Sequence, residues 1–438
     1  MTATSLPFFG HDVDSPARAR AASWTYGALF AGYFLFALVG LHPFADGTLA
    51  ERADGSPLDR VYVIALFALA LVTLALSGKA ASARLGENLA AAAMLVIAVA
   101  SLAWSDYPQF TLRRALLLVL LSVAAWAVAA GAPTMRRFHT LLFSALAAVV
   151  ALNLLAILAF PGAALSDLGA KGVYTQKNVA GLIAMLAAIV AATWTAGAAR
   201  RGERLMGALV TALSLVFLFL SRSKTSEALA VAALGLAGLL ALARRAGPAY
   251  GALIAALASL TGAALIVTAL AFDLDARALL GLLPVDPTFT GRDDLWRFAT
   301  DRAMQAPWLG HGYGAFWDVG AAHDPLAHID PGTWLGDVAP GVINEAHNGY
   351  LELWLELGAP ATVLATLAIL KGAVAATRSA WSARGGESRA AYAMIALVLG
   401  VFLAHNLTEA TLFVRGTPSF SLAFVCLLLA AKPWREEL

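Results

Sequence analysis

The chain has 438 residues, of which 60% are hydrophobic and only 13% are charged, and its mean hydropathy is +0.75. This composition excludes a soluble globular protein of the same size, because too few polar side chains are present to cover its surface. The net charge of +2 gives no reason to expect a nucleic-acid partner, and the single cysteine, Cys426, excludes a disulfide framework within the chain. We therefore predict an all-α integral membrane protein.

Apolar runs of about 20 residues, the length that crosses a bilayer as a helix, occur twelve times. They are too long and too continuously apolar for the alternating strands of a membrane barrel. Residues 1–23 are polar and show no small-residue cleavage site, so we expect a cytoplasmic tail and not a signal peptide. The predicted spans are residues 24–41, 60–77, 88–104, 112–130, 140–160, 179–196, 205–220, 226–243, 251–272, 350–370, 390–406 and 418–431.

Lysines and arginines are distributed unevenly between alternate connections. Outside residues 273–349, seventeen lie on the side of the N-terminal tail and nine on the other side. Positive charge favours the cytoplasmic side, so both termini are predicted in the cytoplasm and the long polar loop outside. The predicted organisation is a tail (1–23), nine spans (24–272), the outer loop (273–349) and three spans with a cytoplasmic C-terminal tail (350–438). We find no internal repeat and no ATP-binding loop.

Cationic residues at the outer headgroup level are the first candidates for a site. Arg222 and Lys224 lie in the short connection between the seventh and eighth predicted spans, so they cannot rise far from the membrane. They contact lipid headgroups, or they form an anion site for a lipid-linked phosphate, which the planar guanidinium of arginine binds well. The hydroxyls that would assist such a site belong to Ser221, Ser223 and Thr225. Headgroup contact is the default interpretation for Arg113 and Arg114.

Two further polar clusters flank predicted spans on the same side. Lys177 and Asn178 precede the sixth span, where they form either a solvated helix start or a substrate contact. His405 and Glu409 end the eleventh span. Charged groups at membrane depth are functional candidates, although this pair could also close a buried hydrogen-bond network between spans.

The outer loop contains a predicted short helix after Gly291, a glycine-rich turn at residues 310–314 and a histidine at its membrane re-entry. His347 and Asn348 directly precede the tenth span, and Glu345 would orient His347 or contact sugar. Two histidine–aspartate pairs in the loop match no strong metal-ligand spacing, so we expect no metal; these are His323-Asp324 and His328-x-Asp330. We expect residues 310–330 to shape an acceptor channel.

An ordered set of motifs resembles the O-antigen ligase/polymerase superfamily of bacterial membrane glycosyltransferases, and within it the exopolysaccharide-polymerase branch. The resemblance covers nearly the whole chain, although each motif alone is weak. The motifs are Lys177-Asn178-x-x-Gly181, Ser221-Arg222-Ser223-Lys224-Thr225, Gly291-Arg292-x-Asp294-x-Trp296, Pro307-x-x-Gly310-x-Gly312-Tyr313-Gly314 and Ala346-His347-Asn348-Gly349-Tyr350-Leu351-x-x-x-x-Glu356-x-Gly358.

The resemblance implies a metal-independent, inverting glycosyltransferase of the inner membrane, with its long loop in the periplasm. Its donor would be a glycan on undecaprenyl diphosphate, and it would need no cofactor. The family's diphosphate-contacting arginines fall on Arg222 and Arg292, and its loop histidine falls on His347. Fixed cations stabilise the leaving diphosphate, and a histidine with its usual pKa near 6.5 suits a base for the acceptor hydroxyl. The predicted substrate-binding residues are Lys177, Asn178, Lys224, Glu345, Asn348, Tyr350 and Glu409.

Three functions remain open from the sequence. The favoured one is a polymerase that joins lipid-linked repeat units into exopolysaccharide or O-antigen. The second is a ligase that moves the glycan onto lipid A-core or protein, and the third is a flippase for the same lipid, which repeated halves would favour. Expected partners are the undecaprenyl-diphosphate-linked oligosaccharide, membrane lipids, and flippase, chain-length-control and export proteins.

Overall fold

The structure is a computed structural model. It describes residues 16–45, 55–77, 88–247 and 292–431, apart from residues 328, 330, 331, 334, 339 and 340. The described residues form helices and connections, with one antiparallel pair of two-residue strands, β1 (Leu165–Ser166) and β2 (Gly169–Ala170). The predicted all-α membrane architecture is confirmed.

Most helices that the structure describes lie before the long loop. They are α1 (Pro16–Leu38), α3 (Pro57–Ser77), α5 (Leu89–Ala100) with the 3-10 turn η1 (Ser101–Ala103), α6 (Pro108–Gly131), α7 (Met135–Ala159), α8 (Pro161–Ala164), α9 (Lys177–Gly197), α10 (Arg201–Ser221) and α11 (Lys224–Ala246). Local sequence sets several of the starts. Proline occupies the first turn of α6, where its missing N–H costs nothing, and the Thr134 hydroxyl accepts a hydrogen bond from the Arg137 N–H at the start of α7.

The later part of the chain contains a short helix in the outer loop and three long or buried helices. They are α14 (Arg292–Ala303), the 3-10 turn η2 (Ala321–His323), α15 (Gly349–Ser382), α16 (Gly386–His405) and α17 (Pro418–Ala431). The predicted loop helix is therefore present, and the residues directly before Arg292 lie outside the described part of the chain.

Eleven of the twelve predicted spans coincide with a helix in the part of the chain that the structure describes. Within the described residues, eight helices are long and apolar enough to cross a membrane, and α5 with η1 and α17 are shorter apolar helices. The ninth predicted span, residues 251–272, lies outside the described residues, so the count of twelve stays a prediction. Helix α1 begins at Pro16, within the predicted tail, since the alanines and arginines after this proline favour helix.

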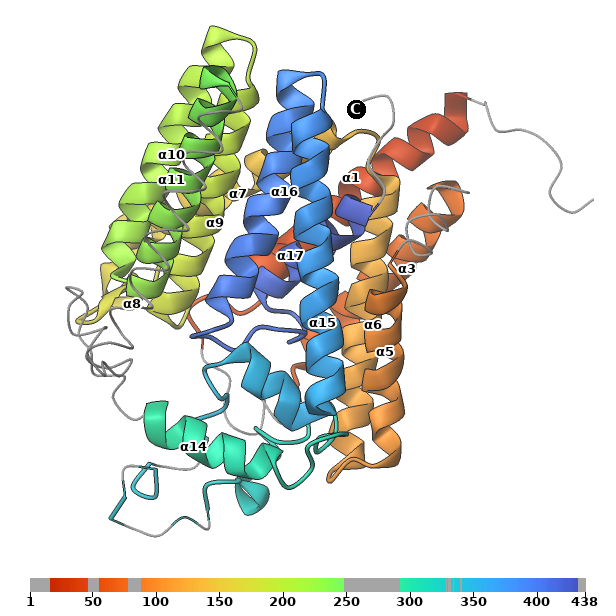
Figure 1. The fold of residues 1–438 in the computed structure, drawn as a ribbon, viewed down its shortest axis with the longest axis vertical. Helices are drawn as coiled ribbons and strands as arrows, with labels where there is room; N and C mark the ends of the chain where they lie inside the picture. The colour runs from red at the N-terminus through yellow and green to blue at the C-terminus, as the bar shows by residue number, and fades with distance from the viewer. Residues whose placement is uncertain are drawn as a thin grey trace, which may run out of the picture.

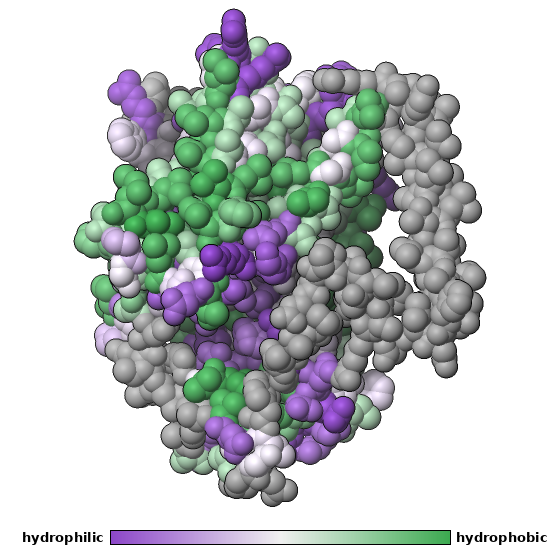
Figure 2. Space-filling view, turned by 90° about the vertical axis from the view of Figure 1, so that its left-hand side faces the viewer, coloured by the Kyte–Doolittle hydropathy of each residue, from purple (hydrophilic) through white to green (hydrophobic). Residues whose placement is uncertain are grey.

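Helices α9 and α17 form the centre of the bundle. Helix α9 packs against α7, α10, α11 and α16, and α17 packs against α6, α15 and α16. In Figure 1 the helices α7, α9, α10 and α11 form one side of the bundle and α1, α3, α5 and α6 the other, with α15, α16 and α17 between them. Figure 2 shows a broad hydrophobic band on one face, with hydrophilic residues gathered below it towards the outer loop.

The connections predicted to lie outside meet at one end of the bundle, the lower end in Figure 1, beside α14. Described residues of three connections predicted to lie inside meet at the opposite end, where Arg136 pairs with Glu387 at 2.8 Å and Arg244 lies over the ring of Trp381. This separation agrees with alternate crossing of a membrane. Which end faces the cytoplasm remains the prediction from the charge count.

Helix α15 consists of two segments that meet at Gly358. This residue has φ 83°, a left-handed conformation that glycine adopts without strain, and Pro360 follows it. The segment after Gly358 is about 36 Å long at 1.5 Å per residue, enough to cross a hydrocarbon core of about 30 Å. The first segment, residues 349–357, therefore belongs to the outer part of the molecule, where it packs against α14.

The glycine motif of the loop is explained by close packing against this bend. A side chain on Gly310 would come within 2.4 Å of the Glu356 backbone, and one on Gly358 within 2.1 Å of the Trp308 carbonyl oxygen. The His311 N–H donates to the Leu355 oxygen at 2.8 Å. The turn at residues 307–314 therefore holds the loop against α15. Its glycines allow the backbone to approach its neighbours more closely than a side chain would permit.

Candidate active site

The start of α9 connects the polar clusters that the sequence places far apart. The Lys177 ammonium group donates to the backbone oxygen of Arg222 at 3.4 Å. The Asn178 amide donates to Glu409 Oε1 at 3.1 Å, across 231 residues of sequence. Two adjacent residues of one helix thus join the α10–α11 connection to the segment after α16. We call the group Lys177, Asn178, Arg222, Arg292, Glu345, His347 and Glu409 the outer cluster.

Arg292 reaches the outer cluster from the first residue of α14. Its guanidinium donates to the Thr408 oxygen at 3.0 Å and lies 3.4 Å from Glu409 Oε1. Its side chain is 23% exposed, so the pair is only partly screened by water. Burial alone would raise the pKa of Glu409, but contact with His347 and the charge of Arg292 lower it. Glu409 is therefore a stable carboxylate that holds three donor groups in place.

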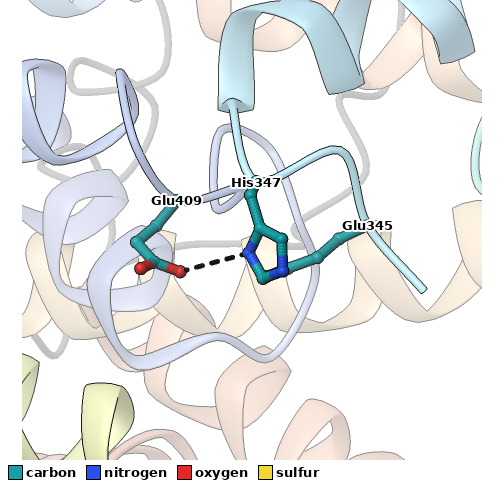
Figure 3. Close-up of side chains that lie close together, drawn as sticks. All are labelled: Glu345, His347 and Glu409. Atoms are coloured by element: carbon teal, nitrogen blue, oxygen red, sulfur yellow. Dashed lines mark ion pairs between the residues drawn. The ribbon is translucent and has the colours of Figure 1, made fainter. Parts of the chain in front are cut away.

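His347 lies between two carboxylates, as Figure 3 shows. Its Nδ1 atom is 2.8 Å from Glu345 Oε1 and 3.6 Å from Glu409 Oε2. No hydrogen bond links Nε2 to any of the described residues. A carboxylate on Nδ1 with a free Nε2 is the arrangement in which an imidazole acts as a base through Nε2.

The protonation of His347 differs from the sequence-based expectation. Burial opposes the charged ring, but contact with Glu345 and Glu409 outweighs burial and raises the pKa of His347 to about 9. At pH 7 about one ring in a hundred is then neutral. The assumption of an unperturbed pKa near 6.5 is therefore wrong for this structure, because the sequence does not show that two carboxylates meet one nitrogen.

Ala346, directly before His347, is held by hydrogen bonds through both its N–H group and its backbone oxygen. The Ala346 N–H donates to Glu352 Oε2 at 2.7 Å, and the Ala346 oxygen accepts from the Trp296 indole at 2.9 Å. Glu352 is 5% exposed and also accepts from the Trp317 indole at 3.0 Å. His347 itself adopts φ 48°, an uncommon conformation for a side-chain-bearing residue. Glu352 thus holds a strained backbone that aims the imidazole.

We predict that Glu352→Ala lowers the rate of the expected glycosyl transfer by about 10- to 100-fold. The Ala346 and Trp317 N–H groups would lose their acceptor, and His347 would move as a result. Glu352→Gln should restore most of the rate, since an amide oxygen can accept both hydrogen bonds. Initial rates with saturating and limiting substrate will separate kcat from KM. A role for the Glu352 charge itself would be indicated instead if the glutamine variant were as slow as the alanine variant.

Asn348 and Tyr350 stabilise the start of α15. The Asn348 side-chain oxygen accepts from the N–H groups of Tyr350 and Leu351, both at 3.1 Å, as helix-capping asparagines do. The Tyr350 hydroxyl donates to the Leu403 oxygen at 2.7 Å. Both side chains are therefore structural, and both are also partly exposed beside His347, so their predicted substrate contacts remain predictions.

Arg222 lies in the two-residue turn between α10 and α11, and Lys224 is the first residue of α11. Arg222 ends α10 in the left-handed conformation, with φ 52°, and one of its guanidinium nitrogens donates to the Asp167 oxygen at 3.3 Å. Its side chain is exposed, and it is the Arg222 backbone oxygen that accepts from Lys177. Lys224 instead pairs with Glu227 at 3.1 Å and is 74% exposed, so the structure does not bring it into contact with the outer cluster.

The serine hydroxyls near Arg222 are not free for an anion. Ser221 donates to the Leu218 oxygen at 2.6 Å, Ser223 donates to Ser226 at 3.1 Å, and both are buried. A side chain on Gly181 would come within 2.3 Å of Ser223 Cβ, which explains why glycine follows Lys177 and Asn178. The proposed assistance of Ser221 and Ser223 is therefore wrong: these residues close the turn against α9.

The default interpretation of Arg114 as a headgroup contact is also wrong. Arg114 is 7% exposed, and its guanidinium donates to three backbone oxygens of the loop, those of Gly314, Trp317 and Asp318. It therefore ties the loop to α6. Sequence reasoning missed this role, and it also missed the buried Glu352; a charged residue within an apolar helix was the available signal for both.

Three residues of the outer cluster have the geometry to hold a metal ion. Ligand atoms of Glu345, His347 and Glu409 lie within 4.8 Å of one another. Arg292 and Asn178 already donate to Glu409, and a charged His347 would have to lose its proton before binding a metal. These contacts occupy Glu409 Oε1 and would compete with a metal ion for it.

Residues 208–366 match the family model described as O-antigen ligase. The match confirms the resemblance to the O-antigen ligase/polymerase superfamily. It includes Arg222, Arg292, Glu345 and His347, whereas Lys177, Asn178 and Glu409 lie outside it and enter the site through the contacts above. No curated protein matches the chain.

Proposed function

From this family resemblance, we propose that the protein is an inverting glycosyltransferase that uses a glycan on undecaprenyl diphosphate as donor. We further propose that it acts as a polymerase, joining lipid-linked repeat units at the periplasmic face of the inner membrane. The observation that carries the proposal is the convergence of Lys177, Arg222, Arg292 and His347 at one end of the bundle. A chain with scattered cations would not offer a diphosphate site.

The cations suit the leaving group. When the bond between the anomeric carbon and the diphosphate oxygen breaks, its electron pair leaves with the diphosphate, whose added negative charge needs stabilisation. Arg222 and Lys177 supply positive charge from one side of the outer cluster, and Arg292 supplies it from α14. Arginine remains charged at every working pH and matches phosphate oxygens with its planar donors.

The proton of the acceptor hydroxyl needs a base. The new bond forms between the acceptor oxygen and the anomeric carbon, on the face opposite the leaving diphosphate, and the hydroxyl proton passes to Nε2 of neutral His347. Glu345 holds the other ring proton on Nδ1 and stabilises the imidazolium that forms. This assignment requires the minor neutral form of His347 at pH 7, which makes the rate sensitive to pH.

The ligase function is the second candidate, because the matching family model is described as O-antigen ligase. A ligase and a polymerase would share the donor site and differ in the acceptor. The predicted preference for polymerisation rests on the Gly312-Tyr313-Gly314 and His347-Asn348-Gly349-Tyr350-Leu351 motifs. In the structure these residues anchor the loop and cap α15, roles that either enzyme needs.

An acceptor assay separates the two functions. Purified protein is incubated with an undecaprenyl-diphosphate-linked repeat unit and no other acceptor, and the products are resolved by gel. We expect a ladder of increasing chain length. If product appears only after lipid A-core is added, the protein is a ligase, and if neither mixture reacts while the lipid crosses vesicle bilayers, the flippase alternative gains support.

A further inference from the structure

A groove of about 410 Å³ lies beside the outer cluster, between α14 and α15. Three aromatic side chains, Trp296, Tyr350 and Trp354, form much of its wall. The lining also includes Ala359, Thr362 and Val363 at the start of the second segment of α15, and Asn348, next to His347, at the start of the first segment. The groove therefore connects the second segment of α15 with the candidate active site.

The aromatic walls are fixed in position. The Trp296 indole donates to the Ala346 oxygen, the Tyr350 hydroxyl to the Leu403 oxygen and the Trp354 indole to the Pro307 oxygen, at 2.9, 2.7 and 3.1 Å. The polar atom of each of these side chains is thus hydrogen-bonded to a backbone oxygen, and mainly carbon atoms face the groove. Such a surface suits an apolar ligand and needs no rearrangement to bind it.

The groove changes in polarity along its length. The second segment of α15 is long and apolar enough to cross the membrane. We therefore place its first turns, including Val363, at the outer boundary of the bilayer. Val363 is 56% exposed, as a residue that faces lipid is expected to be. At the other end Asn348 lies beside the ion pairs of His347. The groove is thus apolar near the membrane and polar near the site. A lipid-linked saccharide has the same arrangement, with an apolar chain in the membrane and a polar sugar outside it.

We propose that the groove binds the polyprenyl chain of the lipid-linked acceptor and so brings the acceptor saccharide to His347. The inference rests on the proposed function, because a polymerase must hold two lipid-linked substrates at once. The diphosphate of the donor is assigned to the cations around Arg222, on α9 and α10. The groove on α14 and α15 gives the second lipid a separate path to the same cluster, on the side of the proposed base.

Cross-linking tests occupancy without requiring catalysis. The photoreactive p-benzoylphenylalanine replaces Val363 in one variant and Leu367, an exposed residue of α15 outside the groove lining, in a control. Each protein is placed in phosphatidylcholine nanodiscs with a polyprenyl-diphosphate-linked saccharide, irradiated and analysed by mass spectrometry. We expect adducts with the polyprenyl lipid at position 363 and with phosphatidylcholine at 367. Adducts with phosphatidylcholine alone at both positions would overturn the proposal.

Kinetics test the assignment to the acceptor. Thr362→Trp fills the groove, and Leu367→Trp adds the same side chain outside it. For Thr362→Trp we expect the KM of a full-length polyprenyl acceptor to rise at least about tenfold, with the KM of a soluble short-chain acceptor unchanged. A rise in the donor KM instead would assign the groove to the donor and contradict the proposal. If the wild type transfers to neither acceptor, the proposed function fails while the cross-linking result still stands.

Discussion

Alanine in place of His347 is expected to lower the rate of glycosyl transfer by about 10²- to 10⁴-fold, the usual contribution of a general base. The loss should appear in kcat, because in the proposed mechanism the ring acts on the acceptor hydroxyl, and the cations proposed to hold the diphosphate remain. Single-turnover assays with bound donor will measure it. A suitable control is His42→Ala, since His42 pairs with Asp59 and, among the described residues, forms no hydrogen bond or ion pair with the outer cluster.

The role of His347 as a base also predicts how the rate of glycosyl transfer depends on pH. His347 must be neutral to accept a proton, and its pKa is raised to about 9. The rate should therefore rise about tenfold per pH unit between pH 6 and 8 and level off above about 9. Glu345→Gln removes one of the two carboxylates, lowers the pKa and should shift this midpoint to lower pH. A rate that instead falls above pH 9 would show that the charged ring is the active form.

The membrane spans were predictable because hydropathy over about 20 residues reports burial in lipid directly. Their ends were not, since caps and bends set them: α10 and α11 are separated by two residues, Arg222 and Ser223, where a longer connection was expected. The bend at Gly358 likewise depends on the docking of residues 307–314, which no local pattern shows.

Sequence reasoning named the residues of the outer cluster, but it also named Lys224, which the structure leaves outside, and it gave none of the geometry. Motif order indicated Arg222, Arg292 and His347, because each sits at the outer edge of a span or in the loop. The contacts that define the site join distant segments, such as Asn178 with Glu409 across 231 residues. The raised pKa of His347 follows from such contacts, so it could not be read from the sequence. For the same reason Arg114 was assigned to lipid although its guanidinium binds the loop backbone.

Arg292 is expected to give the second large effect. Its guanidinium lies in the outer cluster at the edge of α14, 3.4 Å from Glu409, and its side chain is partly exposed, so it can exchange part of this contact for an incoming diphosphate. Arg292→Ala should lower kcat/KM by about 10²- to 10³-fold, the range found when one donor to a developing anion is removed. Initial rates over a range of donor concentrations will measure the effect.

Two variants make the Arg292 prediction specific. Arg292→Lys keeps the charge but loses the planar donors, so we expect it to recover only part of the activity. Arg297→Ala removes an arginine of the same helix that is 74% exposed and pairs with Asp294, and it should leave the rate unchanged. If lysine at position 292 restored full activity, charge alone would explain the role of this residue. If alanine at 292 were as active as alanine at 297, the diphosphate would have to bind elsewhere, and Arg222 with Lys177 would be the remaining cations of the outer cluster.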